Sequence, residues 1–238
     1  MERTIVIGDV HGCADELGDL LDRLQVKDRD RIIQVGDLIN RGPDSSRCVR
    51  MAQAHGFEMV LGNHELRLLK ARQSGDISAL KAYDYGTLAE LTDGDWAFLQ
   101  QARPYCHLAQ YQAVVVHGGF LPNQAWQSQS LEVTARIQVI DADGRAAKRS
   151  QAPEAPAWAC QWAKVWTETD ASRPFVIYGH TPRPEVFHQK GSIGIDTGCV
   201  YGGHLTAFVV EEARCIQVPA RCAYVASKRF PSSGPSVY

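Results

Sequence analysis

Three short apolar segments in the first third of the chain each end at a glycine, and a side chain able to ligate a metal follows each glycine directly. The segments with these endings read GDVHG at 8–12, GDLINRG at 36–42 and GNHE at 62–65. Helical patterns separate them, so the order strand, helix, strand, helix, strand, helix is typical of a parallel sheet flanked by helices. Because the carboxyl ends of parallel strands meet at one edge, the three endings are predicted to converge there.

The apolar periodicity predicts an α/β (α+β) chain with two strand-rich parts. Leucines recur at i, i+3, i+4 and i+7 from Leu17 to Leu24, as on one face of a helix. Close turns in the second half favour a second sheet of mixed or antiparallel strands. Segment 141–157 has no periodicity and is expected to be a surface loop. The expected strands are 4–7, 31–35, 57–61, 105–109, 113–116, 136–140, 175–178, 192–195, 205–210 and 215–218, and the expected helices are 17–24, 45–54, 64–73 and a helical region at 76–101.

Composition narrows the class of protein. The 25 basic and 27 acidic residues give a net charge of −2, so no strong signal for nucleic acid arises. Seven scattered cysteines without a CxxC pair indicate reduced thiols, and no apolar run approaches the roughly 20 residues of a membrane span. The start of the chain has no signal-peptide pattern. We expect a cytoplasmic enzyme with one domain over 1–228 and a flexible tail at 229–238.

Two later segments add further metal-type ligands, His117 before two glycines and His180 after Gly179. Carboxylate, imidazole and amide donors suit Mn, Fe, Co, Zn or Mg, with no thiolate competing. Two such ions stabilise attacking and leaving oxygens and lower the pKa of water between them. Each motif alone is commonly a turn or a helix N-cap. Their conjunction at strand ends predicts a centre of two divalent ions, most typically Mn, that hydrolyses a phosphate ester or anhydride.

Two side chains beside the predicted ligands supply complementary chemistry. The guanidinium of Arg41 can clamp phosphate oxygens bidentately. A leaving alkoxide needs a proton, and His64 is the candidate acid.

In this order, the motifs resemble the calcineurin-like metallophosphoesterases of the phosphoprotein-phosphatase superfamily, whose pattern GDxHG, GDxxDRG, GNHE, HG and GH is matched from Gly8 to His180. The resemblance implies a four-layer αββα sandwich with two mixed sheets flanked by helices. It also implies Arg41 as the phosphate ligand and His64 as the general acid. The implied metal ligands are Asp9, His11 and a bridging Asp37 for the first ion, and Asp37, Asn63, His117 and His180 for the second.

One departure from the family pattern carries information. Protein phosphatases of the superfamily have a second aspartate in GDxxDRG that pairs with the GNHE histidine, and here that position is Asn40. An amide can orient His64 but cannot stabilise an imidazolium by charge, so His64 should be less readily protonated. This favours substrates whose leaving group is itself a phosphate.

With a neutral residue at the Asn40 position, and in segment 196–206, the chain resembles the symmetrical diadenosine tetraphosphatases and their relatives. That resemblance implies a nucleotide or phosphorylated small-molecule substrate, with Arg136 as a second phosphate contact and His204 as a pocket residue. A serine/threonine protein phosphatase or a general phosphomonoesterase is the enzyme alternative, with a phosphoprotein substrate less favoured. A catalytically inactive phosphate-binding scaffold is the alternative from another class. An engineered Asp→Asn change at position 40 is a further possibility that the sequence leaves open.

Overall fold

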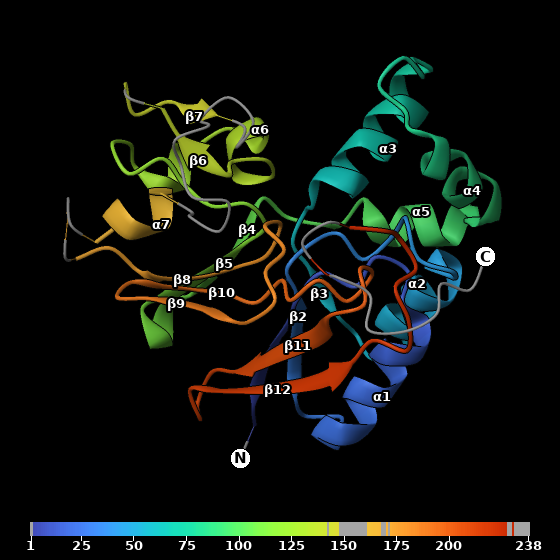
Figure 1. Cartoon of the computed structure of the whole chain (residues 1–238), viewed down its shortest axis with the longest axis horizontal. Coiled ribbons are helices and arrows are strands. Elements are labelled where there is room, and N and C mark those ends of the chain that lie inside the picture. The colour runs from blue at the N-terminus through green and yellow to red at the C-terminus, as the bar shows by residue number, and fades with distance from the viewer. Residues whose placement is uncertain are drawn as a thin grey trace.

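Two five-stranded mixed sheets form the centre of the protein, seen in a computed structural model that describes residues 2–141, 143–147, 161–167, 170, 172–227 and 230 (Figure 1). The first sheet has the order β12-β11-β1-β2-β3. Strands β1, β2 and β3 run parallel, and β11 joins β1 antiparallel with Ile7 opposite Ala207. These strands are β1 (Thr4–Ile7), β2 (Arg31–Gln34), β3 (Glu58–Met59), β11 (His204–Val209) and β12 (Arg214–Pro219).

The second sheet has the order β4-β5-β8-β10-β9. Its central strands β5, β8 and β10 are parallel to one another, and the edge strands β4 and β9 run antiparallel to their neighbours. A separate pair, β6 and β7, lies away from both sheets. The bounds are β4 (Tyr105–Leu108), β5 (Ala113–Val116), β6 (Val139–Ile140), β7 (Ala146–Ala147), β8 (Phe175–Tyr178), β9 (Phe187–Gln189) and β10 (Ser192–Gly194).

Helices cover the outer faces of the two sheets. Helix α1 packs on β11 and β12, α2 contacts α1, α4 and α5, and α7 packs near β6. The described α-helices are α1 (Ala14–Leu24), α2 (Ser45–Ala54), α3 (Asn63–Ser74), α4 (Ala82–Glu90), α5 (Asp93–Leu99), α6 (Leu131–Thr134) and α7 (Gln161–Val165), with 3₁₀ turns at η1 (Ala109–Tyr111) and η2 (Trp126–Ser128).

Three apolar cores account for the layers. The middle core joins side chains of both sheets, among them Val6, Ile33 and Ile177. A second core fills the space between the first sheet and its helices, and Trp96 of α5 belongs to it. The third packs α7 against the second sheet through Trp162. Because residues alternate between the two faces of a strand, each sheet contributes to two cores. The result is the helix–sheet–sheet–helix arrangement expected from the sequence.

Most expected elements are confirmed to within a few residues, and four expectations are wrong. The strands predicted at 205–210 and 215–218 extend the first sheet and do not join the second. The strand predicted at 136–140 is shortened to β6. The region predicted as loop at 141–157 contains β7, which pairs with β6, and residues 148–157 lie outside the described part. Strand β9, which has only three residues, was not predicted.

No helix in the described ranges is long and apolar enough to cross a membrane. The predicted tail at 229–238 falls almost wholly outside those ranges, and the boundary at 228 therefore stays a prediction.

The middle core should carry much of the stability. Ile177 is fully buried between the sheets, whereas Ile77 is 58% exposed. We expect Ile177→Ala to lower the free energy of unfolding by about 2–5 kcal/mol, because it removes buried methyl groups and leaves a cavity. Ile77→Ala should change it by less than about 0.5 kcal/mol. Urea unfolding measures both, and equal losses would show that Ile177 does not lie in a packed core.

Candidate active site and metal centre

The predicted ligands come together at the carboxyl ends of strands from both sheets. Asp9 and His11 follow β1, Asp37 follows β2, Asn63 begins α3 after β3, His117 follows β5 and His180 follows β8. Four of these six residues are buried, and Asn63 and His180 are partly exposed. The site therefore opens at the shared edge where the two sheets meet.

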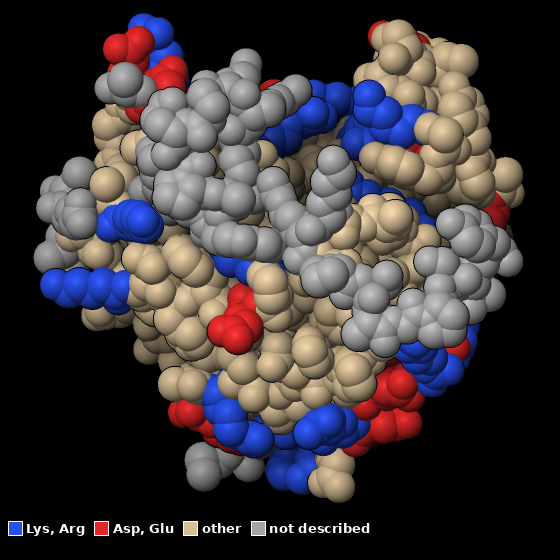
Figure 2. All heavy atoms as spheres, in the orientation of Figure 1, with Lys and Arg blue, Asp and Glu red and all other residues tan. Residues whose placement is uncertain are grey.

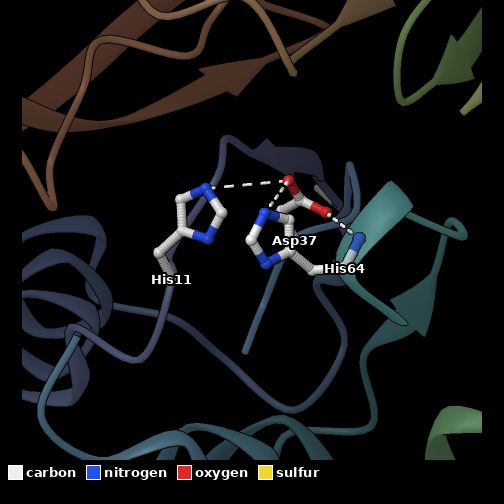
Figure 3. A group of neighbouring side chains, drawn as sticks. All are labelled: His11, Asp37 and His64. Atoms are coloured by element: carbon white, nitrogen blue, oxygen red, sulfur yellow. Dashed lines mark hydrogen bonds and ion pairs between the residues drawn. The ribbon is translucent and has the colours of Figure 1, made fainter. Parts of the chain in front are cut away.

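The carboxylate of Asp37 lies at the centre of the group (Figure 3). Its Oδ2 lies 3.4 Å from Nε2 of His117, 3.6 Å from Nε2 of His11 and 3.9 Å from Nε2 of His64. Its Oδ1 accepts the backbone N–H of His64 at 2.9 Å. Three imidazoles, from the loop after β1, the first turn of α3 and the loop after β5, thus face one carboxylate.

The donor atoms divide into two groups that share Asp37. His11, Asp37 and His64 form one group, and Asp37, His117 and His180 form the other. Within each group the available donor atoms all lie within 4.8 Å of one another. A carboxylate common to two clusters of nitrogen donors is what a pair of divalent ions with a bridging ligand requires.

Hydrogen bonds orient the histidine rings for this task. Nδ1 of His11 and of His117 each donates to a backbone carbonyl oxygen, at 3.2 and 3.1 Å, so both rings turn Nε2 toward the centre. Nε2 of His117 also lies 3.2 Å from Oδ1 of Asn63. His180 has Nε2 against the carbonyl of Arg136 at 3.2 Å, which leaves Nδ1 as its free donor atom. Such outer hydrogen bonds fix the tautomer that binds a metal.

The ionisation of these groups also fits a cation at the centre. Burial lowers the pKa of His11 and of His180 to about 3, so both rings are neutral ligands at neutral pH. Burial acts in the same direction on His117, but the carboxylates of Asp37 and Asp9 outweigh it and raise its pKa to about 9. The buried carboxylates therefore draw a positive charge to the place between them.

Asp9 occupies the edge of this centre. Both of its carboxylate oxygens accept the backbone N–H of His180 at 3.1 Å. This approach depends on the residue before His180, because a Cβ on Gly179 would lie 2.0 Å from Oδ1 of Asp9. Asp9 belongs to neither of the two donor groups that share Asp37, and its carboxylate faces the His180 amide.

Five predicted site residues have left-handed backbone conformations, which are uncommon for residues other than glycine. They are His11, Asp37, Asn40, Arg41 and His180, with φ between 52° and 75°. Such residues persist only where the surrounding structure holds them, and they concentrate at functional sites.

Glu65 holds the loop that carries Asp37. Its buried carboxylate accepts the backbone N–H groups of Asp37, Leu38 and Ile39 at 2.9, 2.9 and 3.3 Å. Burial and the Asp37 charge raise the pKa of Glu65 to about 7. The last residue of the GNHE motif thus positions the central ligand and does not face the donor groups itself.

His64 is held from behind by a polar network that reaches into α4. Its Nδ1 lies 3.1 Å from Nδ2 of Asn40 and 3.2 Å from Nη2 of Arg67. The same Asn40 nitrogen donates to Oδ1 of Asp84 at 2.7 Å. Arg67 donates to both carboxylate oxygens of Asp84, at 2.7 and 2.8 Å.

This network fixes which atoms carry protons. The amide of Asn40 must present its NH₂ group to Asp84, since its oxygen would repel the carboxylate. The NH₂ group and Arg67 are donors only, so Nδ1 of His64 accepts and Nε2 carries the proton. Burial lowers the pKa of His64 well below its usual range, and Asp37 opposes this only in part. The expectation of a weakly basic His64 has geometric support.

The guanidinium of Arg41 stands at the rim of the centre. Its Nη1 donates to the hydroxyl of Tyr201 at 2.7 Å and lies 3.0 Å from Nε2 of His11. The rings of Tyr83 and Tyr201 lie 5.6 and 5.7 Å from its Cζ, close enough for cation–π attraction. Tyr83 also stacks on His64, with centroids 5.5 Å apart.

The two remaining predicted residues differ in position. Arg136 lies near the site, because its carbonyl contacts His180, while its side chain pairs with Glu132 at 2.9 Å. His204 begins β11 in a groove lined by Arg23, Arg214 and other residues outside the site. The structure does not bring His204 to the donor groups.

Several site residues had no signal in the sequence. Asp84, Arg67 and Tyr83 belong to helices whose spacing shows no motif, and only the fold carries Asp84 to Asn40. Asp196 lies in a segment singled out by its resemblance, yet its buried carboxyl, with a pKa raised by burial to about 6, had no assigned place beside Asp9.

Comparisons with known proteins agree with this geometry. The family model described as calcineurin-like phosphoesterase matches residues 2–207. A PrpE bis(5'-nucleosyl)-tetraphosphatase, asymmetrical, of Halalkalibacterium halodurans is 29% identical and covers 95% of this chain and 98% of its own. A symmetrical bis(5'-nucleosyl)-tetraphosphatase of Chromohalobacter salexigens is 30% identical over 86% of this chain and 93% of its own.

Solved structures give the same result. A candidate diadenosine tetraphosphatase superimposes with a TM-score of 0.79 at 29% identity, covering 92% of this chain and 94% of that one. A serine/threonine phosphatase of Saccharomyces cerevisiae, at 16% identity and a TM-score of 0.55 over 92% of this chain and 79% of that one, shares the fold alone. The protein is a metal-dependent hydrolase of phosphoric esters or anhydrides. The chain belongs to the calcineurin-like phosphoesterase family.

Proposed function

We propose that this protein hydrolyses dinucleoside polyphosphates and cleaves diadenosine tetraphosphate symmetrically into two ADP molecules. The network behind His64 carries the proposal. A neutral His64 whose Nδ1 faces only donors is a poor acid for an alkoxide, but a departing ADP needs little protonation. Relatives named for symmetrical and asymmetrical cleavage are about equally similar, so the position of the cut is a question for product analysis.

The ligand sets are those predicted from the motifs. Asp9, His11 and Asp37 would hold one ion, and Asn63, His117 and His180 would join Asp37 at the other. Two divalent ions, for which we propose Mn, supply a water of lowered pKa and neutralise charge at phosphate. Fe, Zn, Co and Mg share the same donor preference and are the alternatives.

The surroundings suit an anionic nucleotide. Arg41 points a guanidinium at the rim of the centre, and Tyr83, 37% exposed, offers a ring beside it on which a base could stack. Lys and Arg side chains gather around the hollow between the lobe of α3 and α4 and the lobe of α6, β6 and β7 (Figure 2). The six described cysteines are free thiols, in keeping with a cytoplasmic location.

The alternatives make different demands on His64. A serine/threonine protein phosphatase expels an alkoxide and benefits from a carboxylate beside the acid, a place that Asn40 occupies. An inactive scaffold would need no central donor groups, whereas the described residues keep two.

Product analysis tests the proposal directly. With manganese present, the protein should cleave diadenosine tetraphosphate much faster than a phosphoserine peptide, and chromatography should find ADP as the only nucleotide product. ATP with AMP would instead mean asymmetrical cleavage. Faster release of phosphate from the peptide would overturn the proposal.

Removal of the shared ligand tests the two-ion assignment. We expect Asp37→Ala to lower kcat/KM by at least about a thousandfold, or about 4 kcal/mol of transition-state stabilisation, because both donor groups lose a member. Bound manganese per chain should fall in parallel. Asp76→Ala removes an exposed carboxylate and serves as the control. Retention of most activity by Asp37→Ala would contradict the assignment.

The carboxylate next to Asn40 gives a pH-dependent prediction. Asn40→Asp would place two carboxylates 2.7 Å apart in a buried site, and we expect it to lower the free energy of unfolding by about 1–3 kcal/mol at neutral pH. Repulsion by Asp84 raises the folded-state pKa of the introduced carboxyl, so the folded state binds more protons than the unfolded state. The loss should therefore grow as pH rises and shrink as pH falls.

Urea unfolding at several pH values measures this effect. The double variant Asn40→Asp/Asp84→Asn, compared with Asp84→Asn alone, should show less loss than Asn40→Asp does in the native background. A loss that is independent of pH and of residue 84 would mean that the two side chains do not interact.

A further inference from the structure

A second buried group of metal-type side chains lies outside the candidate active site. The thiols of Cys13 and Cys199 and the carboxylate of Glu16 have donor atoms that all lie within 4.8 Å of one another. All three residues are at most 1% exposed. None of them belongs to the predicted ligands of the two-ion centre, and the group unites sulfur with oxygen where that centre has only nitrogen and oxygen.

The Glu16 carboxylate is only half satisfied. Its Oε1 accepts the backbone N–H of Arg221 and the hydroxyl of Tyr224, both at 2.9 Å. Its Oε2 has no hydrogen-bond partner among the described residues. A buried carboxylate oxygen without a partner is costly. Since Oε1 is occupied, Oε2 is the oxygen available to an ion between the two thiols.

The donor types select a class of ion. Two sulfur ligands favour a soft or borderline ion such as Zn²⁺ over Mn²⁺ or Mg²⁺. Zn²⁺ accepts cysteine sulfur at about 2.3 Å and carboxylate oxygen at about 2.0–2.2 Å, so tetrahedral ligands lie roughly 3.5–4 Å apart. The observed limit of 4.8 Å is compatible with that spacing. Cys48 is fully buried near Cys199, outside the group itself, and is a third thiol of this region.

Reactive-thiol chemistry suits this place less well. A hydrogen bond with Cys13, together with burial, raises the pKa of the Cys199 thiol well above its usual range. A buried neutral thiol is a weak nucleophile and is slow to oxidise. Coordination stabilises the thiolate directly, and the charge of the ion offsets that of Glu16.

We propose that Cys13, Glu16 and Cys199 form a separate binding site for one thiophilic divalent ion of the zinc type. The ion would tie together segments that are distant in sequence. Cys13 directly precedes α1, Glu16 lies in the first turn of α1, and Cys199 lies in the turn between β10 and β11. A bound ion would therefore join the loop that carries His11 to the loop that carries Asp196, on the side away from the substrate.

Cadmium alone is a suitable probe, because thiolate–cadmium bonds give an ultraviolet charge-transfer absorption that nitrogen and oxygen ligands do not. The metal-free, reduced full chain should bind one Cd²⁺ ion that gives this absorption. Any Cd²⁺ held by nitrogen and oxygen ligands should bind without it. Cys199→Ser should abolish the absorption. Cys215→Ser changes a half-buried thiol on β12 outside the group and should keep it.

Glu16→Gln guards against a variant that simply fails to fold, since it keeps both thiols and an oxygen for Arg221 and Tyr224. This variant should lower the affinity for the Cd²⁺ ion that gives the absorption by about tenfold or more. Circular dichroism of each variant checks the fold. No charge-transfer absorption in the native chain, or an unchanged one in Cys199→Ser, would overturn the proposal. A Cys13–Cys199 disulfide that forms again after reduction and prevents ion binding would also overturn the proposal.

Discussion

The site depends on the burial of one carboxylate, that of Asp37, among three imidazoles. Its Oδ1 accepts the backbone N–H of His64, and Glu65 accepts three successive backbone N–H groups of the loop that carries Asp37. Burial alone would raise the pKa of Asp37, yet the surrounding histidines hold it well below the usual range. The left-handed backbone at His11, Asp37 and His180 is sustained by this convergence, because each loop must turn sharply from a strand end to face the same point.

The position of Asn40 links the fold to the chemistry. In isolation an amide there looks like the loss of a catalytic carboxylate. In the structure the carboxylate lies one step further away, in Asp84 of α4, where it binds both Arg67 and the amide. The carboxylate of Asp84 thereby pairs with the guanidinium of Arg67 and does not stabilise a protonated His64. The amide is the side chain that this network accommodates, which favours Asn40 as a native residue over an engineered replacement.

The sequence predicts those parts of the structure that depend on local patterns. The prediction that the strand ends before Asp9, Asp37 and Asn63 converge is confirmed, because β1, β2 and β3 are parallel neighbours. Partners set by tertiary contact were beyond it: Asp84 reaches Asn40 across 44 positions, and β11 pairs with β1 although 195 or more positions separate them in the chain. His204 is a case of the same kind, since it begins β11 and lines a groove away from the donor groups.

The helical segment from α3 to α5 is where the specificity of this chain would be expressed. The motifs that resemble the family predict a centre that can act on both phosphate esters and phosphate anhydrides, and they do not indicate which of the two is the substrate. Arg67, Tyr83 and Asp84 come from α3 and α4, and together they set the protonation of His64 and cover its ring. A change at Arg67, Tyr83 or Asp84 would therefore alter the leaving groups that the proposed centre can expel without touching any predicted metal ligand. Those ligands lie at strand ends and at Asn63, the first residue of α3.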